Sequence, residues 1–134
     1  MIVRLLYSDI SEIPSEELRA KVRRTRHEDT VEIRPGAEFE VMGVIVRHDD
    51  VEYLLCPDVD GSPVVLHRAW FSIEDHSPRA DWRWVFDENE SVAILPEYWA
   101  SIPSFRERLI DGMHDAELAF RQLRECFGDR AERT

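Results

Sequence analysis

Short apolar runs, each ended by turn-forming residues, occupy the middle of this chain and limit the folds it can form. Residues 39–46 are almost continuously apolar and β-branched, and a second run at 51–56 follows the turn sequence 48–50. Two such runs joined by a tight turn predict an antiparallel hairpin. Gly43 interrupts the first run, and a glycine within a strand predicts a bulge or a bend.

Three further segments have strand character. Residues 64–67, 82–86 and 91–95 are rich in apolar and aromatic side chains and are separated by polar, acidic stretches. Strands of this length and spacing predict a small, strongly bent antiparallel sheet or an SH3-like barrel. Trp82 and Trp84 are two positions apart, so they lie on the same face of their strand.

The last third of the sequence has a different periodicity. Ser104 is followed three positions later by Glu107, which is the pattern of a helix-capping box, and Gly128 suits the end of a helix. Apolar side chains recur at helical spacing between these points, at Phe105, Leu109, Met113, Ala116, Phe120, Leu123 and Phe127. This pattern predicts a long helix over 104–127 that packs on the sheet, and hence an α+β fold.

A chain of 134 residues is about the size of one domain. We therefore expect residues 1–134 to form a single domain in three parts. Residues 1–30 are expected to supply a strand and a short helix, since Pro-Ser-Glu-Glu at 14–17 is typical of a helix start. Residues 31–95 are expected to form the antiparallel β region, and residues 104–127 the C-terminal helix.

The charge balance indicates the kind of partner. Asp and Glu number 28 against 17 Lys and Arg, which gives a net charge of −11, while 43% of the residues are hydrophobic. Such a chain folds but repels nucleic acid and anionic lipid, so its expected partner is a basic protein. The sequence has neither a signal-peptide pattern at its start nor an apolar run of about 18 residues, which predicts a cytoplasmic protein.

Motifs for catalysis or metal binding are missing from the sequence. The five glycines stand apart, so no phosphate-binding loop is formed, and Cys56 and Cys126 belong to no zinc motif. The run at 58–61, Asp-Val-Asp-Gly, resembles part of a calcium loop but lacks oxygen ligands at the loop's two ends. We expect no cofactor, no metal and no enzymatic activity. A carboxylate pair assisted by His48 or His67 is the enzymatic alternative.

Acidic residues follow several of the predicted strands, and we expect them to gather as a negative rim that binds the partner. Trp84 or Trp70 would supply the buried anchor that protein interfaces usually need. The predicted partner-binding residues are Asp49, Asp50, Glu52, Asp58, Asp60, Glu74, Asp75, Trp84, Asp87, Glu88 and Glu90.

Four segments together resemble a known group of proteins. Residues 39–46 (Phe-Glu-Val-Met-Gly-Val-Ile-Val), 53–56 (Tyr-Leu-Leu-Cys), 81–84 (Asp-Trp-Arg-Trp) and 96–99 (Pro-Glu-Tyr-Trp) follow in the order found in small bacterial immunity-type proteins of contact-dependent and polymorphic toxin systems. The resemblance covers about residues 33–127. It implies a small bent sheet or SH3-like barrel with a C-terminal helix, and a binding function without catalytic residues.

Two functions follow as expectations. In the first, the protein is an immunity or inhibitor protein that binds and neutralises a cognate toxin acting in the cytosol, through its acidic surface. In the second, it is a non-inhibitory interaction or scaffold domain that forms a homodimer on an exposed strand edge.

Overall fold

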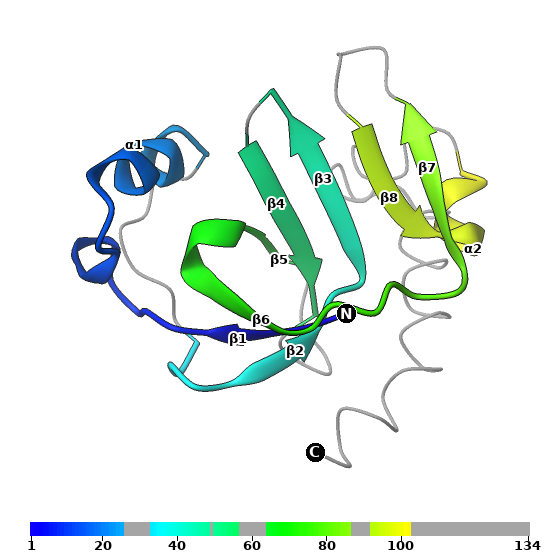
Figure 1. Cartoon of the computed structure of the whole chain (residues 1–134). Coiled ribbons are helices and arrows are strands. Elements are labelled where there is room, and N and C mark those ends of the chain that lie inside the picture. Colours follow the sequence, from blue (N-terminus) through cyan, green and yellow to red (C-terminus); the bar gives the residue numbers. More distant parts are fainter. Residues whose placement is uncertain (26–32, 49, 57–63, 87–91, 103–134) are drawn as a thin grey trace.

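The computed structural model describes residues 1–25, 33–48, 50–56, 64–86 and 92–102. In this part of the chain, eight strands form two antiparallel sheets, accompanied by two short α-helices (Figure 1). The smaller sheet has the order β2-β1-β6, with β1 at Ile2–Leu5, β2 at Glu38–Glu40 and β6 at Phe71–Asp75.

The larger sheet has the strand order β5-β4-β3-β8-β7. Its strands are β3 (Gly43–Arg47), β4 (Asp50–Leu55), β5 (Val64–His67), β7 (Trp82–Phe86) and β8 (Val92–Pro96). Strands β3 and β4 pair as the predicted hairpin, with Arg47 opposite Asp50. The hairpin turn contains His48 in the left-handed region at φ 51°, which few residues other than glycine, Asn and Asp adopt.

The chain passes from one sheet to the other between β2 and β3. The N–H of Val41 donates to the carbonyl of Met1 in the smaller sheet, whereas the N–H of the next residue, Met42, donates to Leu54 in the larger sheet. Gly43 follows at once, where a side chain would meet the Ile94 carbonyl at 3.0 Å and a Leu95 methyl at 2.8 Å. The run at 39–46 is therefore divided, because its successive residues bond to different sheets.

Two apolar cores result from the alternation of side chains along these strands. The main core lies between the sheets and includes the fully buried residues Val3, Leu5, Ile13, Val22, Val41, Leu55 and Trp70. A second core on the opposite face of the larger sheet contains Met42, Leu54, Leu95 and Trp99. Trp99 lies on the short helix α2 (Glu97–Ala100), which follows β8 directly.

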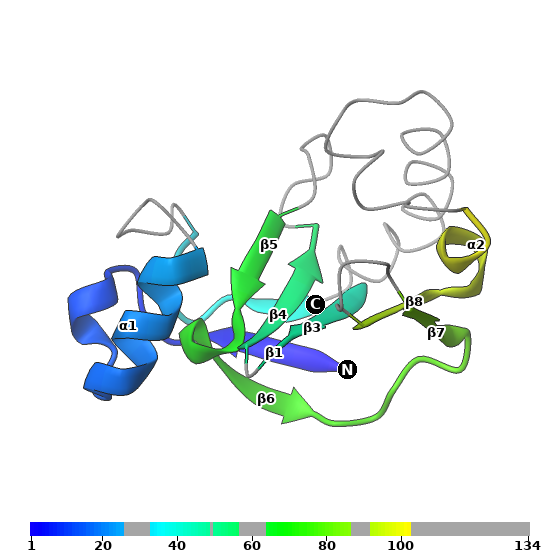
Figure 2. The same ribbon diagram turned by 90° about the horizontal axis from the view of Figure 1, so that it is seen from above.

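Helix α1 (Glu16–Thr25) closes one end of the molecule, and α2 lies at the other end beside β7 and β8 (Figure 2). The hydroxyl of Ser15 accepts the N–H of Leu18 at 3.2 Å and so caps the start of α1, as the sequence predicted. Val22 inserts into the main core, while the basic residues of the last turn remain near the surface.

The predicted fold class is wrong in its architecture. The strands separate into two antiparallel sheets, instead of one bent sheet or an SH3-like barrel, because the chain changes sheet at 41–42. The fold of the described residues is mostly β, and its two helices are short. The predicted helix at 104–127 lies outside the described residues. Antiparallel β-structure, which the sequence also predicted, is confirmed.

Candidate functional site

Three aromatic side chains alternate along β7 and share one face of it. Trp82 is partly buried and packs against the main core, whereas Trp84 and Phe86 are 66% and 79% exposed. Strand β7 is the last strand of the larger sheet, so these rings stand at the side of the molecule. Aromatic side chains of this size are usually buried, because each removes a large apolar area from water.

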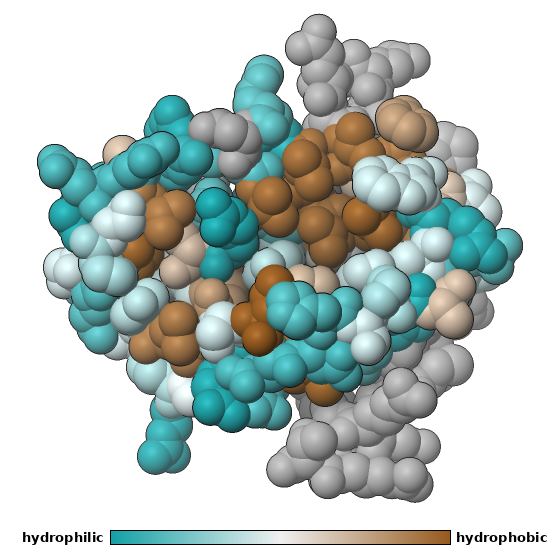
Figure 3. Space-filling model, in the orientation of Figure 1, coloured by the Kyte–Doolittle hydropathy of each residue, from teal (hydrophilic) through white to brown (hydrophobic). Residues whose placement is uncertain are grey.

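Apolar residues of the neighbouring strands continue this surface toward the core. Trp84 lies opposite Ile94 of β8, and Phe86 lies opposite Val92, which in turn pairs with Val46 of β3. We call these five residues the aromatic face. Figure 3 shows an area of hydrophobic side chains over β3 and β8 that reaches β7. Exposed apolar surface that is continuous with a core commonly marks an interaction site.

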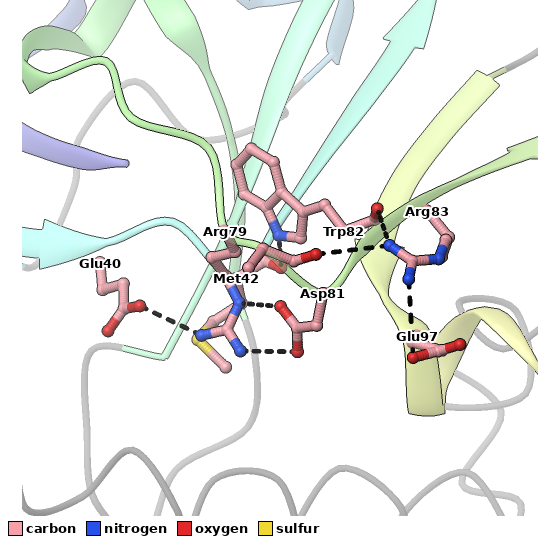
Figure 4. A network of polar contacts seen from close by, with 8 residues as sticks. Glu40, Met42, Arg79, Asp81, Trp82, Arg83 and Glu97 are labelled. Carbon is pink, nitrogen blue, oxygen red and sulfur yellow. Dashed lines mark hydrogen bonds and ion pairs between the residues drawn. The ribbon is translucent and has the colours of Figure 1, made fainter.

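A network of polar contacts fixes the start of β7 (Figure 4). The guanidinium of Arg79 donates two hydrogen bonds to Asp81, at 2.9 and 2.8 Å, and a third to Glu40 at 3.1 Å. The indole N–H of Trp82 donates to the carbonyl of Met42 at 3.0 Å. These bonds join β7 to the point where β2 leads into β3. The hydrogen bonds from Arg79 also hold the pKa of Asp81 below its ordinary value.

The opposite face of β7 is tied to α2. Arg83 donates to the carbonyl of Trp82 at 2.9 Å, and its guanidinium lies 3.8 Å from the carboxylate of Glu97. Val85, on this same face, packs against the second core. Since the start and the rear of β7 are held, this strand is preorganised, which lowers the entropy cost of binding.

Asp50, one of the predicted partner-binding acids, contacts the protein itself. Its carboxylate lies 3.2 Å from Nε2 of His67 and 3.9 Å from the guanidinium of Arg24 on α1. Its side chain is only 15% exposed. Glu52, its neighbour along the same face of β4, is buried. Both carboxylates therefore expose little surface in this structure.

His67 is buried and uses both ring nitrogens. Nδ1 accepts the N–H of Ala69 at 3.1 Å, so in the neutral ring Nε2 carries the proton and donates it to Asp50. Burial lowers the pKa of His67 below 6.5, against the opposing effect of the Asp50 carboxylate. An imidazole with both nitrogens engaged has no free site for a substrate proton. This pair therefore holds the turn after β5.

Glu74 and Asp75 lie on the smaller sheet, away from Asp50. Glu74 is 3.6 Å from Arg4 of β1. Asp75 pairs in register with Ile2 and accepts the backbone N–H of Ser77 at 2.8 Å, which lowers the pKa of its carboxyl. The described acids therefore do not form one rim, because they are distributed over two sheets.

The remaining predicted residues lie outside the described part of the chain. They are Asp49, Asp58, Asp60, Asp87, Glu88 and Glu90. Most of the excess negative charge also belongs to residues outside the described ranges.

The two candidate anchors differ sharply in exposure. Trp70 is completely buried in the main core, and its indole N–H has no acceptor among the described residues, so it is no interface anchor. Trp84 is accessible. Phe86, which the sequence analysis overlooked, is more exposed still. The signal for Phe86 was its position two residues after Trp84, on the same face of the strand.

Within the described ranges, His, Cys, Asp and Glu side chains form no group of three that could hold a metal ion. None of the helices described is both long and apolar enough to span a membrane.

Comparisons with models of known protein families, with curated proteins and with solved structures found no match.

Proposed function

We propose that this protein is an interaction protein that binds a partner protein through the aromatic face. The observation that carries this proposal is the exposure of Trp84 and Phe86 on a strand whose start and rear are fixed by polar contacts. Exposed aromatic rings cost solubility, and tryptophan is among the residues most enriched at the energetic centres of protein interfaces. A rigid strand suits this role better than a loop does.

The specific function that we propose is that of an immunity or inhibitor protein, which neutralises a cognate toxin acting in the cytosol. The sequence resemblance to immunity-type proteins supports this choice. The net charge of −11 favours a basic partner, and enzymes that act on nucleic acids or nucleotides present the Lys and Arg needed. In this proposal the aromatic face supplies the anchor, and the acidic side chains raise the rate of association.

A homodimer is the second candidate. Its support is that the aromatic face reaches the end strand of the larger sheet, where a second copy could pair with it. Sedimentation of the purified protein alone distinguishes the two candidates, since the inhibitor proposal expects a monomer and the scaffold proposal a dimer.

Affinity capture from the native cells tests the proposed function. The wild-type protein should retain a basic protein, and Trp84→Ala should lose it. Tyr98→Ala is the matched control, because Tyr98 is 50% exposed but lies on α2, outside the aromatic face. The captured protein should be toxic in cells and should lose its activity when the wild-type protein binds it. Retention of the same partner by Trp84→Ala would reject the aromatic face as the interface.

A further inference from the structure

The outer edge of β7 has backbone groups directed away from the sheet. The N–H of Trp82 donates to the carbonyl of Arg79 at 3.2 Å, and its own carbonyl accepts from Arg83. Its partner across the β7–β8 ladder is Pro96, which has no N–H to donate. Both backbone groups of Trp82 therefore face outward.

The backbone N–H and C=O groups of Trp84 and Phe86 also face outward. In an antiparallel pair, alternate residues direct their backbone N–H and C=O to the same side. The carbonyl of Ile94, opposite Trp84, approaches Gly43 of β3 instead of β7. No described strand pairs with the outer edge of β7. The outward N–H and C=O groups of Trp84 and Phe86 thus lie beside their exposed rings, with no pairing strand among the described residues.

This edge differs from those of the smaller sheet. Strand β2 carries Glu38 and Glu40, and β6 carries Glu74 and Asp75, and charged edge strands discourage pairing with another chain. Strand β7 has instead Trp84 and Phe86 exposed on one face. An aromatic edge strand is suited to receive another strand.

We propose that the partner binds by adding an extended segment to the outer edge of β7, and that this segment alternates Lys or Arg with apolar residues. The inference rests on the proposed function, since it specifies how the aromatic face is recognised. Backbone bonds to Trp84 and Phe86 hold the segment, and its side chains on that side cover the two rings. An Arg side chain can stack on Trp84 through a cation–π contact.

The charge of the protein indicates which kind of segment binds. The protein has a net charge of −11, and its sequence continues from Phe86 into Asp87, Glu88 and Glu90. A second copy of this chain would bring an equal negative charge, whereas a basic segment lowers the total. The occupant is therefore a basic partner rather than another β7.

A pair of variants at one position separates strand addition from simple contact with the rings. Phe86→Ala removes the ring and keeps the outward N–H. Phe86→Pro removes both, yet leaves the ladder with β8 intact, because the N–H of Phe86 takes no part in it. The probe is an end-blocked heptapeptide that alternates Arg and Val, and the control peptide alternates Glu and Val. Trp fluorescence and amide shifts report binding, and thermal unfolding confirms that both variants fold.

The proposal expects the Arg-Val peptide to bind and the Glu-Val peptide not to bind. Phe86→Pro should bind at least about five-fold more weakly than Phe86→Ala, which corresponds to one lost hydrogen bond. In the wild-type protein, the peptide should slow hydrogen exchange at the amides of Trp84 and Phe86, a measurement that needs no variant.

The other outcomes are distinct. Equal binding by the two variants, with no slowing of exchange, overturns strand addition and leaves the proposed function standing. No binding of the Arg-Val peptide overturns the assigned segment chemistry, and the capture experiment then decides the proposed function separately. Dimerisation of the protein without peptide, with slowed exchange at Trp84, assigns the edge to a second copy and overturns the basic partner.

Discussion

The environment of His67 links a single residue to the pH dependence of folding. The buried ring accepts a hydrogen bond from Ala69 and donates one to Asp50, with Glu52, Arg68 and Arg24 near this pair. Burial lowers the pKa of His67 in the folded protein below its unfolded value of 6.5. The unfolded chain therefore takes up the proton first as the pH falls.

His67 should consequently stabilise the fold fully above about pH 6.5 and lose that contribution as the pH falls below it. Denaturant unfolding at pH 7.5 and 5.5 measures this loss. His67→Gln keeps a donor and an acceptor but does not titrate. The free energy of unfolding of this variant should be about 1–2 kcal/mol below that of the wild type at pH 7.5. It should then fall less than that of the wild type between pH 7.5 and pH 5.5. An equal loss in both proteins would assign the pH dependence to other groups.

Gly43 makes a second prediction at this scale. Replacing a glycine by alanine stabilises many proteins by about 0.4–1 kcal/mol when the site has room. Here the added carbon would meet the Ile94 carbonyl at 3.0 Å and Leu95 at 2.8 Å. Gly43→Ala should therefore lower the free energy of unfolding by about 1–3 kcal/mol. A neutral or stabilising result in denaturant unfolding would show that β3 and β8 can separate without cost.

At the scale of elements, the attachment of β7 depends on Arg79. Its side chain is only 12% exposed and bonds to Asp81 and Glu40, so its loss leaves two carboxylates without this partner. Arg79→Ala should cost about 1–3 kcal/mol in unfolding experiments. Arg83→Ala is the comparison, since Arg83 is about half exposed and its ion pair with Glu97 should contribute under about 1 kcal/mol. Equal costs would contradict a structural role for the Arg79 network.

The strands themselves could largely be predicted from the sequence, whereas their arrangement could not. Short apolar runs bounded by turn-forming residues located β4, β5, β7 and β8, because composition and turn signals are local properties of the sequence. Strand β6 was missed, since Phe-Ser-Ile-Glu-Asp at 71–75 ends in acids that resemble a loop. The change of sheet at 41–42 depends on bonds to Met1 and Leu54, which are distant in the sequence.

The candidate site was predictable only in part for a similar reason. Alternation placed Trp82 and Trp84 on one face of a strand, but it does not say whether that face is covered. Exposure depends on the position of β7 at the end of the sheet, which is set by pairing with β8. Asp50 and Glu52 follow a turn, so the sequence predicted that they lie on the surface. In the structure, their strand places them beside the buried His67.

At the scale of the whole molecule, two physical effects are expected to contribute to the proposed binding. The net charge of −11 acts over distances near the Debye length, about 8 Å at physiological salt, and mainly raises the rate of association. In the proposed complex, the aromatic face is expected to act on contact and mainly to slow dissociation. Raising the salt concentration should therefore slow association with the captured partner while leaving dissociation nearly unchanged.

We propose that this protein binds its partner through the aromatic face on β7. The decisive measurement is the dissociation constant of the captured partner for the wild-type protein, for the Trp84→Ala/Phe86→Ala double variant and for Tyr98→Ala. The account predicts a loss of about 100-fold or more for the double variant, as expected for residues at an interface centre, and little change for Tyr98→Ala. A double variant that binds within about two-fold of the wild type, with its fold intact, would contradict the account.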